Sequence, residues 1–334
     1  MSASEGAMTR RHPAGNPRIA AHLAVPIILA LVAVGVASAE LPPGVTRVSA
    51  ADAERTGLAI HLRRQPIRGA TLVQVEAATT GMSLLAVSAD GTQVALADHL
   101  GEASGSLTLA KTNGEQLRIA MPGLLAASFA SDGTWLALID GRGALWRVDA
   151  VSGWSGLLAE GPFIGSPVVE ADGSLLLLAV PSVQAPYQSR LIRLAPATGA
   201  AARLSDEDLI YGAFPLDGGD LAIVAHRMDG NTVRRISGSR DKLLVDLGLG
   251  AVNVAVAGNG RIAYERNGEG VYLVDTPPLG ARRVAAGSRP CFSPNGSSIL
   301  LRRGDQALAL DLDGSVLAVA DEPAGFAGAA GCLP

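Results

Sequence analysis

The sequence predicts an all-β fold made of repeated units, and three observations lead to this prediction. Apolar runs of strand length flank Asp-Gly or Asn-Gly dipeptides, which are typical of tight hairpin turns. These dipeptides recur roughly every 40 residues, and an alternating apolar segment follows each hairpin. The dipeptides are Asp90-Gly91, Asp132-Gly133, Asp172-Gly173, Asp217-Gly218, Asn259-Gly260 and Asn295-Gly296.

Each dipeptide is predicted to join two short antiparallel strands. In the second copy, residues 126–129 precede Asp132-Gly133 and residues 135–139 follow it, and both runs are too short for helices. Asp, Asn and Gly tolerate the positive φ that such a turn requires. We therefore expect a strand, a turn and a second strand in every copy.

A third strand follows each hairpin as an alternating apolar segment that occurs seven times. A loop and one more short run come after it, as in residues 150–159. Four short strands per unit are typical of a blade of a β-propeller. The seven segments are residues 72–76, 107–109, 145–149, 191–194, 233–236, 271–275 and 308–311.

The seven third strands predict seven blades of four antiparallel strands, and six blades is the alternative. A degenerate first hairpin, with residues 48–53 before residues 57–61, supplies the seventh unit. Dividing residues 40–334 by seven gives about 42 residues per blade, which matches the spacing of the turns. We expect almost no helix after residue 40.

The phrase Phe-Ser-Pro-Asn-Gly at 292–296, with its relatives at 129–133 and 214–218, resembles the repeat of TolB-like propellers. This family is a branch of the WD-repeat-like superfamily and is common in bacterial envelopes. The resemblance covers nearly the whole chain after residue 40 and implies the fold. It does not imply a ligand, and partnership with the Tol system is not carried over.

The amino-terminal segment differs in composition from the repeats. Arg10, Arg11 and Arg18 precede an uncharged apolar run over residues 23–36. Such a run predicts a hydrophobic helix, as either a signal peptide or a membrane anchor. A signal peptidase would read Ala37 and Ala39 and cut before Glu40. Both alternatives place the body of the chain outside the cytoplasmic membrane.

The chain is therefore divided into three parts. Residues 1–39 are the signal peptide or anchor, residues 40–320 the propeller, and residues 321–334 a carboxyl-terminal tail. In an oxidising compartment Cys291 and Cys332 are expected to form a disulfide that pins this tail to the last blade. The alternative is a buried apolar role for Cys291 and a free thiol at Cys332.

Composition and motifs exclude several function classes. The chain is 48% hydrophobic, 17% charged and 4% aromatic, with a net charge of -4. A surface of this charge does not predict nucleic-acid binding, and scarce aromatics leave Leu, Val, Ile and Ala to build the core. The Gly-x-Ser-x-Gly elbow of serine hydrolases does not occur.

Candidate metal and ligand groups are scattered along the chain. His61, His99 and His226 stand alone in different units, and Asp311-Leu312-Asp313-Gly314 reads as a turn rather than half of a calcium loop. We therefore expect no metal and no cofactor. Two sets of residues keep two interpretations each. One set of arginines either protects strand edges or forms an anion site: Arg282, Arg283, Arg289, Arg302 and Arg303. The tryptophans either pack in the core or stack on a sugar: Trp135, Trp146 and Trp154.

The sequence favours an exported, monomeric and non-catalytic propeller that binds a protein or a component of the cell envelope. The alternative is a propeller enzyme, such as a lactonase, a glycan-cleaving enzyme or a quinoprotein, with its site in the axial channel. Carboxylates converging with His and Asn on the axis would favour the enzyme. An axis lined by Ala, Ser and Gly would favour binding, and an uncleaved anchor would allow an envelope sensor.

Overall fold

A computed structural model describes residues 41–77, 81–182, 188–205, 209–275, 277 and 280–329. The expected hydrophobic helix, the cleavage residues Ala37, Ala39 and Glu40, and Cys332 lie outside these residues. Within the described part of the chain, no helix has both the length and the apolar character needed to cross a membrane.

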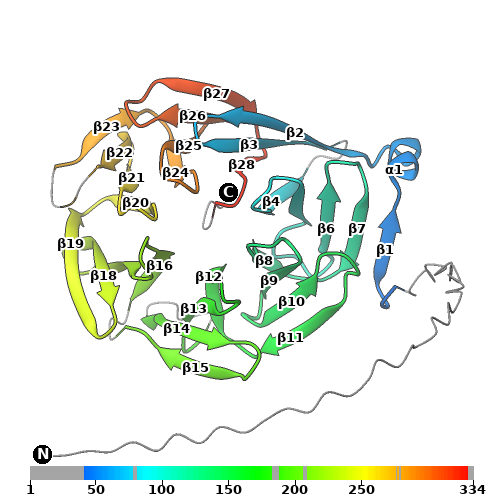
Figure 1. Ribbon diagram of the computed structural model, residues 1–334, viewed down its shortest axis with the longest axis horizontal. Helices are drawn as coiled ribbons and strands as arrows, with labels where there is room; N and C mark the ends of the chain where they lie inside the picture. Colours follow the sequence, from blue (N-terminus) through cyan, green and yellow to red (C-terminus); the bar gives the residue numbers. More distant parts are fainter. Residues whose placement is uncertain are drawn as a thin grey trace, which may run out of the picture. The chain divides into compact units, whose positions relative to one another are not determined.

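Residues 41–334 form one unit in which seven β-sheets are arranged around a common axis (Figure 1). Five sheets have four strands in meander order, and each begins with the strand nearest the axis. These strands are β8 (Leu124–Phe129), β9 (Trp135–Asp140), β10 (Leu145–Asp149), β11 (Ser155–Ala159), β12 (Phe163–Val169), β13 (Leu175–Ala179), β14 (Arg190–Ala195), β15 (Ala200–Arg203), β16 (Ile210–Pro215), β17 (Leu221–Arg227), β18 (Gly230–Ser237), β19 (Arg240–Gly248), β20 (Ala251–Val256), β21 (Ile262–Arg266), β22 (Gly270–Val274), β23 (Arg282–Ala285), β24 (Ser288–Phe292), β25 (Ser298–Arg303), β26 (Gln306–Asp311) and β27 (Val316–Asp321). The prediction of a seven-bladed, all-β propeller is confirmed.

The other two sheets have five and three strands instead of four. The first sheet has five strands, in the order β1 (Val45–Val48), β7 (Gln116–Ala120), β6 (Ser106–Lys111), β5 (Gln93–Asp98) and β4 (Met82–Val87). The closing sheet has three, in the order β2 (Ile60–Ile67), β3 (Ala70–Ala77) and β28 (Ala324–Phe326). Strand β1 pairs with the outer strand of the neighbouring sheet, so one sheet has a strand more and the other a strand fewer than a regular blade.

The closing sheet corrects two expectations. Residues 48–53 and 57–61 do not form a hairpin, because α1 (Ala50–Thr56) lies between β1 and β2. Ser49 caps this helix by accepting a hydrogen bond from the backbone N–H of Asp52, and Gly57 ends it with a φ of 68°. The tail expected from residue 321 also contributes β28 to the ring, so both ends of the chain build the seventh blade.

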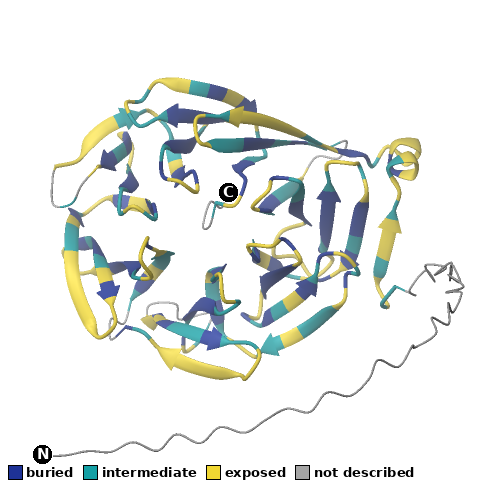
Figure 2. Cartoon of the chain, viewed as in Figure 1, coloured by how far each residue is buried: buried dark blue, intermediate teal, exposed yellow. Residues whose placement is uncertain are grey.

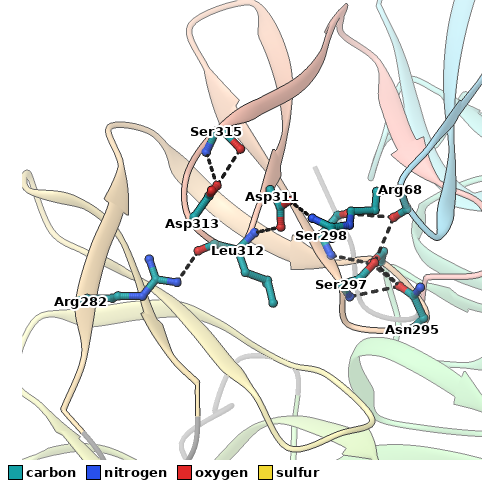
Figure 3. Close-up of polar contacts among 10 residues, drawn as sticks. Arg68, Arg282, Asn295, Ser297, Ser298, Asp311, Leu312, Asp313 and Ser315 are labelled. Carbon is teal, nitrogen blue, oxygen red and sulfur yellow. Dashed lines mark hydrogen bonds and ion pairs between the residues drawn. The ribbon is translucent and has the colours of Figure 1, made fainter.

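The turn between β2 and β3 fastens the closing sheet to the last regular blade (Figure 3). The backbone oxygen of Arg68 accepts hydrogen bonds from the hydroxyls of Ser297 (3.0 Å) and Ser298 (3.2 Å), and its guanidinium pairs with Asp311. Gly69 has a φ of 67°, and a Cβ atom there would lie 2.1 Å from the side-chain nitrogen of Asn295, so a larger residue would be strained and would displace Asn295. The interpretation of Asp311 as a turn residue is consistent with this ion pair.

The core lies between adjacent sheets. Leu107 and Leu136 are fully buried in one cluster that joins the first two sheets, and Leu175 belongs to the next cluster along the ring. Leu, Val, Ile and Ala dominate these clusters, as the composition predicts. Figure 2 shows buried residues in the middle of the blades and exposed residues on outer strands such as β15.

The Asp-Gly and Asn-Gly turns repeat one set of contacts. In three turns the Oδ1 of Asp accepts the backbone N–H two residues later, at 3.0 Å for Asp90, 2.9 Å for Asp132 and 2.8 Å for Asp172. Asn259 and Asn295 accept the equivalent bond at 3.2 and 3.1 Å. The glycines that follow these residues have φ between 65° and 85°, which L-residues with a side chain disfavour.

Candidate functional site

The opposite end of the inner strands carries a second repeated feature. Six inner strands have a register shift where they begin to pair with the second strand of the blade. A β-bulge of this kind frees a residue from the ladder and re-aims its side chain. The shifts lie between Leu84 and Ala86, Leu124 and Ala126, Ile164 and Val168, Ile210 and Gly212, Val252 and Ala255, and Ser288 and Cys291.

A cavity of about 690 Å³ lies at this end, against the first halves of β12, β16, β20 and β24. Its volume is within the range of small-ligand sites. Ser166, Tyr211, Asn253 and Arg289 all come from the shifted segments, and each belongs to a different blade. The bulges therefore bring together four side chains that are distant in the sequence.

Three residues of the cavity form an ordered polar group. His226 and Asn231 are cross-strand partners on β17 and β18, and the imidazole Nδ1 lies 2.8 Å from the amide Oδ1 of Asn231. The amide nitrogen of Asn231 donates to the backbone oxygen of Ala251 at 2.5 Å, so its oxygen must face the histidine. Nδ1 of His226 is therefore the donor of this contact, and Nε2 is the ring nitrogen left without a partner in it. The Tyr211 ring packs edge-on against this imidazole at 5.8 Å.

The backbone is strained at two positions of the cavity wall. Among the described residues, the non-glycine residues with positive φ are His99, Asn253 and Arg289, and the last two line the cavity. One carboxylate holds both, because Oε2 of Glu265 accepts from the Asn253 amide at 2.7 Å and from the Arg289 backbone N–H at 3.2 Å. Strain of this kind accumulates at functional sites.

The charge of the cavity differs from the charge of the chain. The chain has a net charge of -4, yet no Asp or Glu is among the described residues that line the cavity. Arg289 is the one Lys or Arg among the described lining residues; it also borders a hollow of about 60 Å³ beside Arg302 and Glu322, and its guanidinium makes no ion pair among the described residues. The hydroxyl of Ser166 is buried and has no hydrogen-bond partner within the same part of the chain.

The other four arginines have partners outside the cavity. Arg282 contacts Asp275, Arg283 donates to the backbone oxygen of Glu269, Arg302 pairs with Glu322, and Arg303 donates to the backbone oxygen of Ala286. Arg282 and Arg283 lie on β23, the outer strand of its blade, and fit the interpretation as edge residues, whereas Arg302 and Arg303 lie on β25, which is paired on both sides. Arg289 alone of the five lines the cavity.

The predicted histidines are not brought together. His61 lies 3.3 Å from Glu54 beside α1, and His99 lies 3.5 Å from Asp98 in a loop after β5. Only His226 lines the cavity. Among the described residues, no group of three or more His, Cys, Asp or Glu is arranged to hold a metal ion.

The tryptophans do not form a stacking platform. Trp135 is buried between two blades, and the Nε1 of Trp146 donates to Asp140 at 3.0 Å. Trp154 is 54% exposed on the turn before β11. Core packing therefore explains Trp135. The three indole rings have different surroundings, so they do not form one surface for a sugar.

Cys291 is buried in β24 and packs in the same apolar cluster as Phe326 of β28 and Ala329. Cys332 lies three residues beyond Ala329, outside the described residues, and three residues of extended chain reach about 10 Å. The disulfide between Cys291 and Cys332 stays a prediction, and the packing of Ala329 against the cluster that contains Cys291 is consistent with it.

Sequence reasoning missed Tyr211, Asn231 and Asn253, because none of them belongs to a motif. Tyr211 and Asn253 lie in the first half of an inner strand, and Asn231 lies near the start of β18, the third strand of its blade. No local signal marks these positions, because the bulged residues of other blades, such as Leu125 and Ser166, also differ from one another.

No family model matches the chain, and no curated protein is similar to it in sequence. Many solved structures share its fold. TolB from Acinetobacter baumannii has 17% sequence identity and a TM-score of 0.54 over 84% of this chain and 86% of its own. An oligogalacturonate lyase in complex with manganese has 14% identity and a TM-score of 0.58 over 83% of this chain and 86% of its own.

A third similar structure is the β-propeller domain of the Trilobed protease from Pyrococcus furiosus, described as having an open velcro topology. It has 11% identity and a TM-score of 0.50 over 80% of this chain and 95% of its own. At such identities the similarity concerns the fold alone. The chain is thus a seven-bladed β-propeller similar in structure to TolB, to oligogalacturonate lyase and to protease propellers.

Proposed function

We propose that this protein is an exported, non-catalytic binding protein that holds a segment of a partner protein, or of another envelope component, in the cavity at the start of the inner strands. The observation that carries the proposal is the cavity itself, because four bulged strands from different blades converge on it. Its lining combines hydrogen-bonding groups, one arginine and apolar side chains, and a lining of this kind is typical of ligand sites.

Exposed apolar side chains at the same end of the inner strands support binding. Tyr211 is 56% exposed, Leu249 73% and Val252 40%, and all three line the cavity. Leu125, which is freed by the bulge in β8, is also exposed. Apolar groups that remain in contact with water around a hollow are typical of interaction sites.

Site-specific photo-crosslinking tests this proposal. A benzophenone side chain at Leu249 should form a discrete adduct in envelope extract, and the same group at Leu157 on an outer strand should not. Filling the cavity with Val252→Trp should abolish the adduct at Leu249. Equal adducts at both positions, or an adduct that Val252→Trp leaves intact, would contradict binding at the cavity.

Export is proposed from the amino-terminal segment and has its own test. Cell fractionation should place the protein outside the cytoplasmic membrane. A mature chain that begins at Glu40 would identify a cleaved signal peptide, and one that retains Arg10 and Arg11 would identify an anchor. Recovery of the chain in the cytoplasm would contradict export.

A catalytic function in the same cavity is the second candidate, and His226 is the observation that favours it. Its Nδ1 is held by Asn231, so Nε2 is the ring nitrogen available to a substrate beside the Tyr211 ring, as the position of a general base requires. The similarity to a lyase that acts on oligogalacturonate suggests one substrate to test. Formation of unsaturated product with manganese present, lost in His226→Ala, would establish this function.

A further inference from the structure

We propose that the group recognised in the cavity is a carboxylate attached to an apolar body, and that Arg289 binds the carboxylate. This inference rests on the proposed binding function and specifies its ligand class. Two sources share this chemistry: the carboxyl terminus of a partner polypeptide and a free carboxylic acid of small size. The experiment below separates them.

The charge of the cavity indicates an anion. Arg289 lines the cavity without a carboxylate among its described neighbours in the wall, and no ion pair neutralises it within the described chain. Glu265 contacts Arg289 only at its backbone, because its Oε2 accepts from the Arg289 backbone N–H and from the Asn253 amide. An anionic ligand would supply the missing partner of the guanidinium.

The number of cationic groups indicates a carboxylate rather than a phosphate. The lining contains one arginine and no lysine, which suits a group with a single charge. A guanidinium presents two parallel N–H groups that match the two oxygens of a carboxylate. Tyr211 adds a neutral hydroxyl to the lining, whereas the Ser166 hydroxyl is buried away from the cavity surface.

The backbone around Arg289 shows that this position is held in place. Its φ of 50° is unfavourable for a residue with a side chain, and the bulge in β24 separates it from the ladder. Asn253, with a φ of 48°, is the equivalent feature of the preceding blade. Glu265 is bonded to both, so we assign it the part of a positioning residue.

The rest of the wall indicates an apolar body for the ligand. Leu176, Leu178 and Val168 come from the blade of β12, and Val252 and Leu249 come from the other side. Burial of an apolar group among such side chains contributes about 25 cal/mol per Å². The arginine therefore gives the ligand its orientation, and the apolar wall supplies much of its affinity.

Calorimetric titration of the propeller with four probes tests the inference. The probes are phenylacetate, its neutral amide phenylacetamide, and the peptide Ala-Ala-Leu-Phe with either a free or an amidated carboxyl terminus. We expect at least one of the two acids to bind about tenfold more tightly than its own amide, because a hydrogen bond to a charged group is worth more than a neutral one. Binding of the peptide acid alone identifies a chain terminus, and binding of phenylacetate identifies a small acid.

Two arginine variants provide the matched comparison. Arg289→Gln removes the charge in the cavity and should reduce acid binding to the level of the amides. Arg303→Gln removes the same charge at the end of β25, where Arg303 donates to the backbone oxygen of Ala286, and should bind as the unmodified protein does. Glu265→Ala should weaken binding of the acid as well, since it frees both the backbone of Arg289 and the amide of Asn253, and urea-induced unfolding measures how much stability is lost with these two bonds.

Three outcomes overturn the inference: equal binding of acid and amide, equal binding by Arg289→Gln, or no binding of either acid at millimolar concentration. Each leaves the proposed function standing if the adduct at Leu249 is still formed and still lost in Val252→Trp. If that adduct is absent while the acids bind through Arg289, the carboxylate site is established and the macromolecular partner is not. The two failures are therefore distinguishable.

Discussion

The two ends of the inner strands differ in a way that separates fold from function. At the turn end, Asp132 and its equivalents make the same hydrogen bond in blade after blade. At the bulged end, the backbone irregularity is repeated but the side chains are not: Leu125, Ser166, Tyr211, Asn253 and Arg289 occupy it in turn. The comparison teaches that a repeat can keep the same contacts at one end of a strand, where they stabilise the fold. At the other end it can keep only the backbone geometry and vary the side chains.

At the bulged end, the blades on the two sides of the axis carry different side chains. The blades of β4 and β8 contribute Leu85, which is buried, and Leu125, which is exposed. The blades of β12 to β24 contribute the polar side chains and the larger cavity. A smaller hollow of about 140 Å³ lies on the side of β4 and β8, and Ser166 lines both spaces. The polar groups are therefore gathered on one side of the axis.

The largest expected effect concerns a glycine at the turn end. Gly296 has a φ of 65°, and a Cβ atom there would lie 2.7 Å from the side-chain nitrogen of Asn259 and 2.9 Å from Cβ of Ala257 in the preceding blade. Gly296→Ala combines left-handed strain with overpacking and should lower the free energy of unfolding by about 3 kcal/mol. Gly218, with a φ of 89° and open space around it, is the control.

Gly218→Ala should cost about 1 kcal/mol, from strain alone. Urea unfolding of both variants measures the difference. Equal losses would mean that the turns of adjacent blades do not contact one another as described, and the repeated turn would then be a local feature only.

A smaller effect is expected from the repeated carboxylate. Asp132→Ala removes the acceptor of the Thr134 backbone N–H (2.9 Å) and hydroxyl (2.8 Å), and should destabilise the protein by about 1 kcal/mol. Asp217 accepts no such bond from the residue two positions later, so Asp217→Ala should change stability by less than about 0.5 kcal/mol. A larger loss from Asp217→Ala would remove the distinction between the two turns.

Removal of the Tyr211 ring should affect binding rather than folding. Tyr211→Ala should change the free energy of unfolding by less than about 0.5 kcal/mol, because the side chain is 56% exposed. The same change should weaken crosslinking at Leu249 and binding of the acid probes. Leu125→Ala, on the opposite side of the axis, is the control that should leave both measurements unaltered. A comparable loss of binding in Leu125→Ala would extend the site around the whole axis.

The smallest expected effect is the acid sensitivity of the turn end. The backbone N–H of Thr134 lowers the pKa of Asp132, and that of Ser174 lowers the pKa of Asp172. Burial raises the pKa of Asp90, but bonds from Ser88 and Thr92 outweigh it and the net shift is downward. Each carboxylate therefore adds stability that is complete above the ordinary Asp pKa of 3.8 and disappears as the pH falls through the lowered value.

As the pH is lowered from about 7 to about 3, the urea concentration at the unfolding midpoint should stay constant at first and then fall. In Asp132→Asn this fall should be smaller. An identical decline in the variant would show that other groups cause the acid sensitivity. The cavity should not contribute to this acid sensitivity, because no Asp or Glu lines it among the described residues.

The sequence predicted the turn end well because its signal is local. Asp132-Gly133 and the strands on either side of it are fixed by residues that are neighbours in the chain. The closing sheet was predicted less well, since β28 meets β3 across about 250 residues. The helix α1 carries local signals, because Ser49 and Asp52 are spaced as a cap and Gly57 follows as a terminator, but its seven residues are too few to show a clear helical period.

The sequence by itself determined the unit, its period and its number, because hairpin turns and alternating strands depend on contacts between near neighbours. Only the tertiary structure decided how the ring closes and which side chains share the axis. Tyr211, Asn253 and Arg289 stand in three different units, and a bulge directs each one to the same cavity. The physical reason is that a radial arrangement brings equivalent positions of distant repeats together, which no spacing along the chain records.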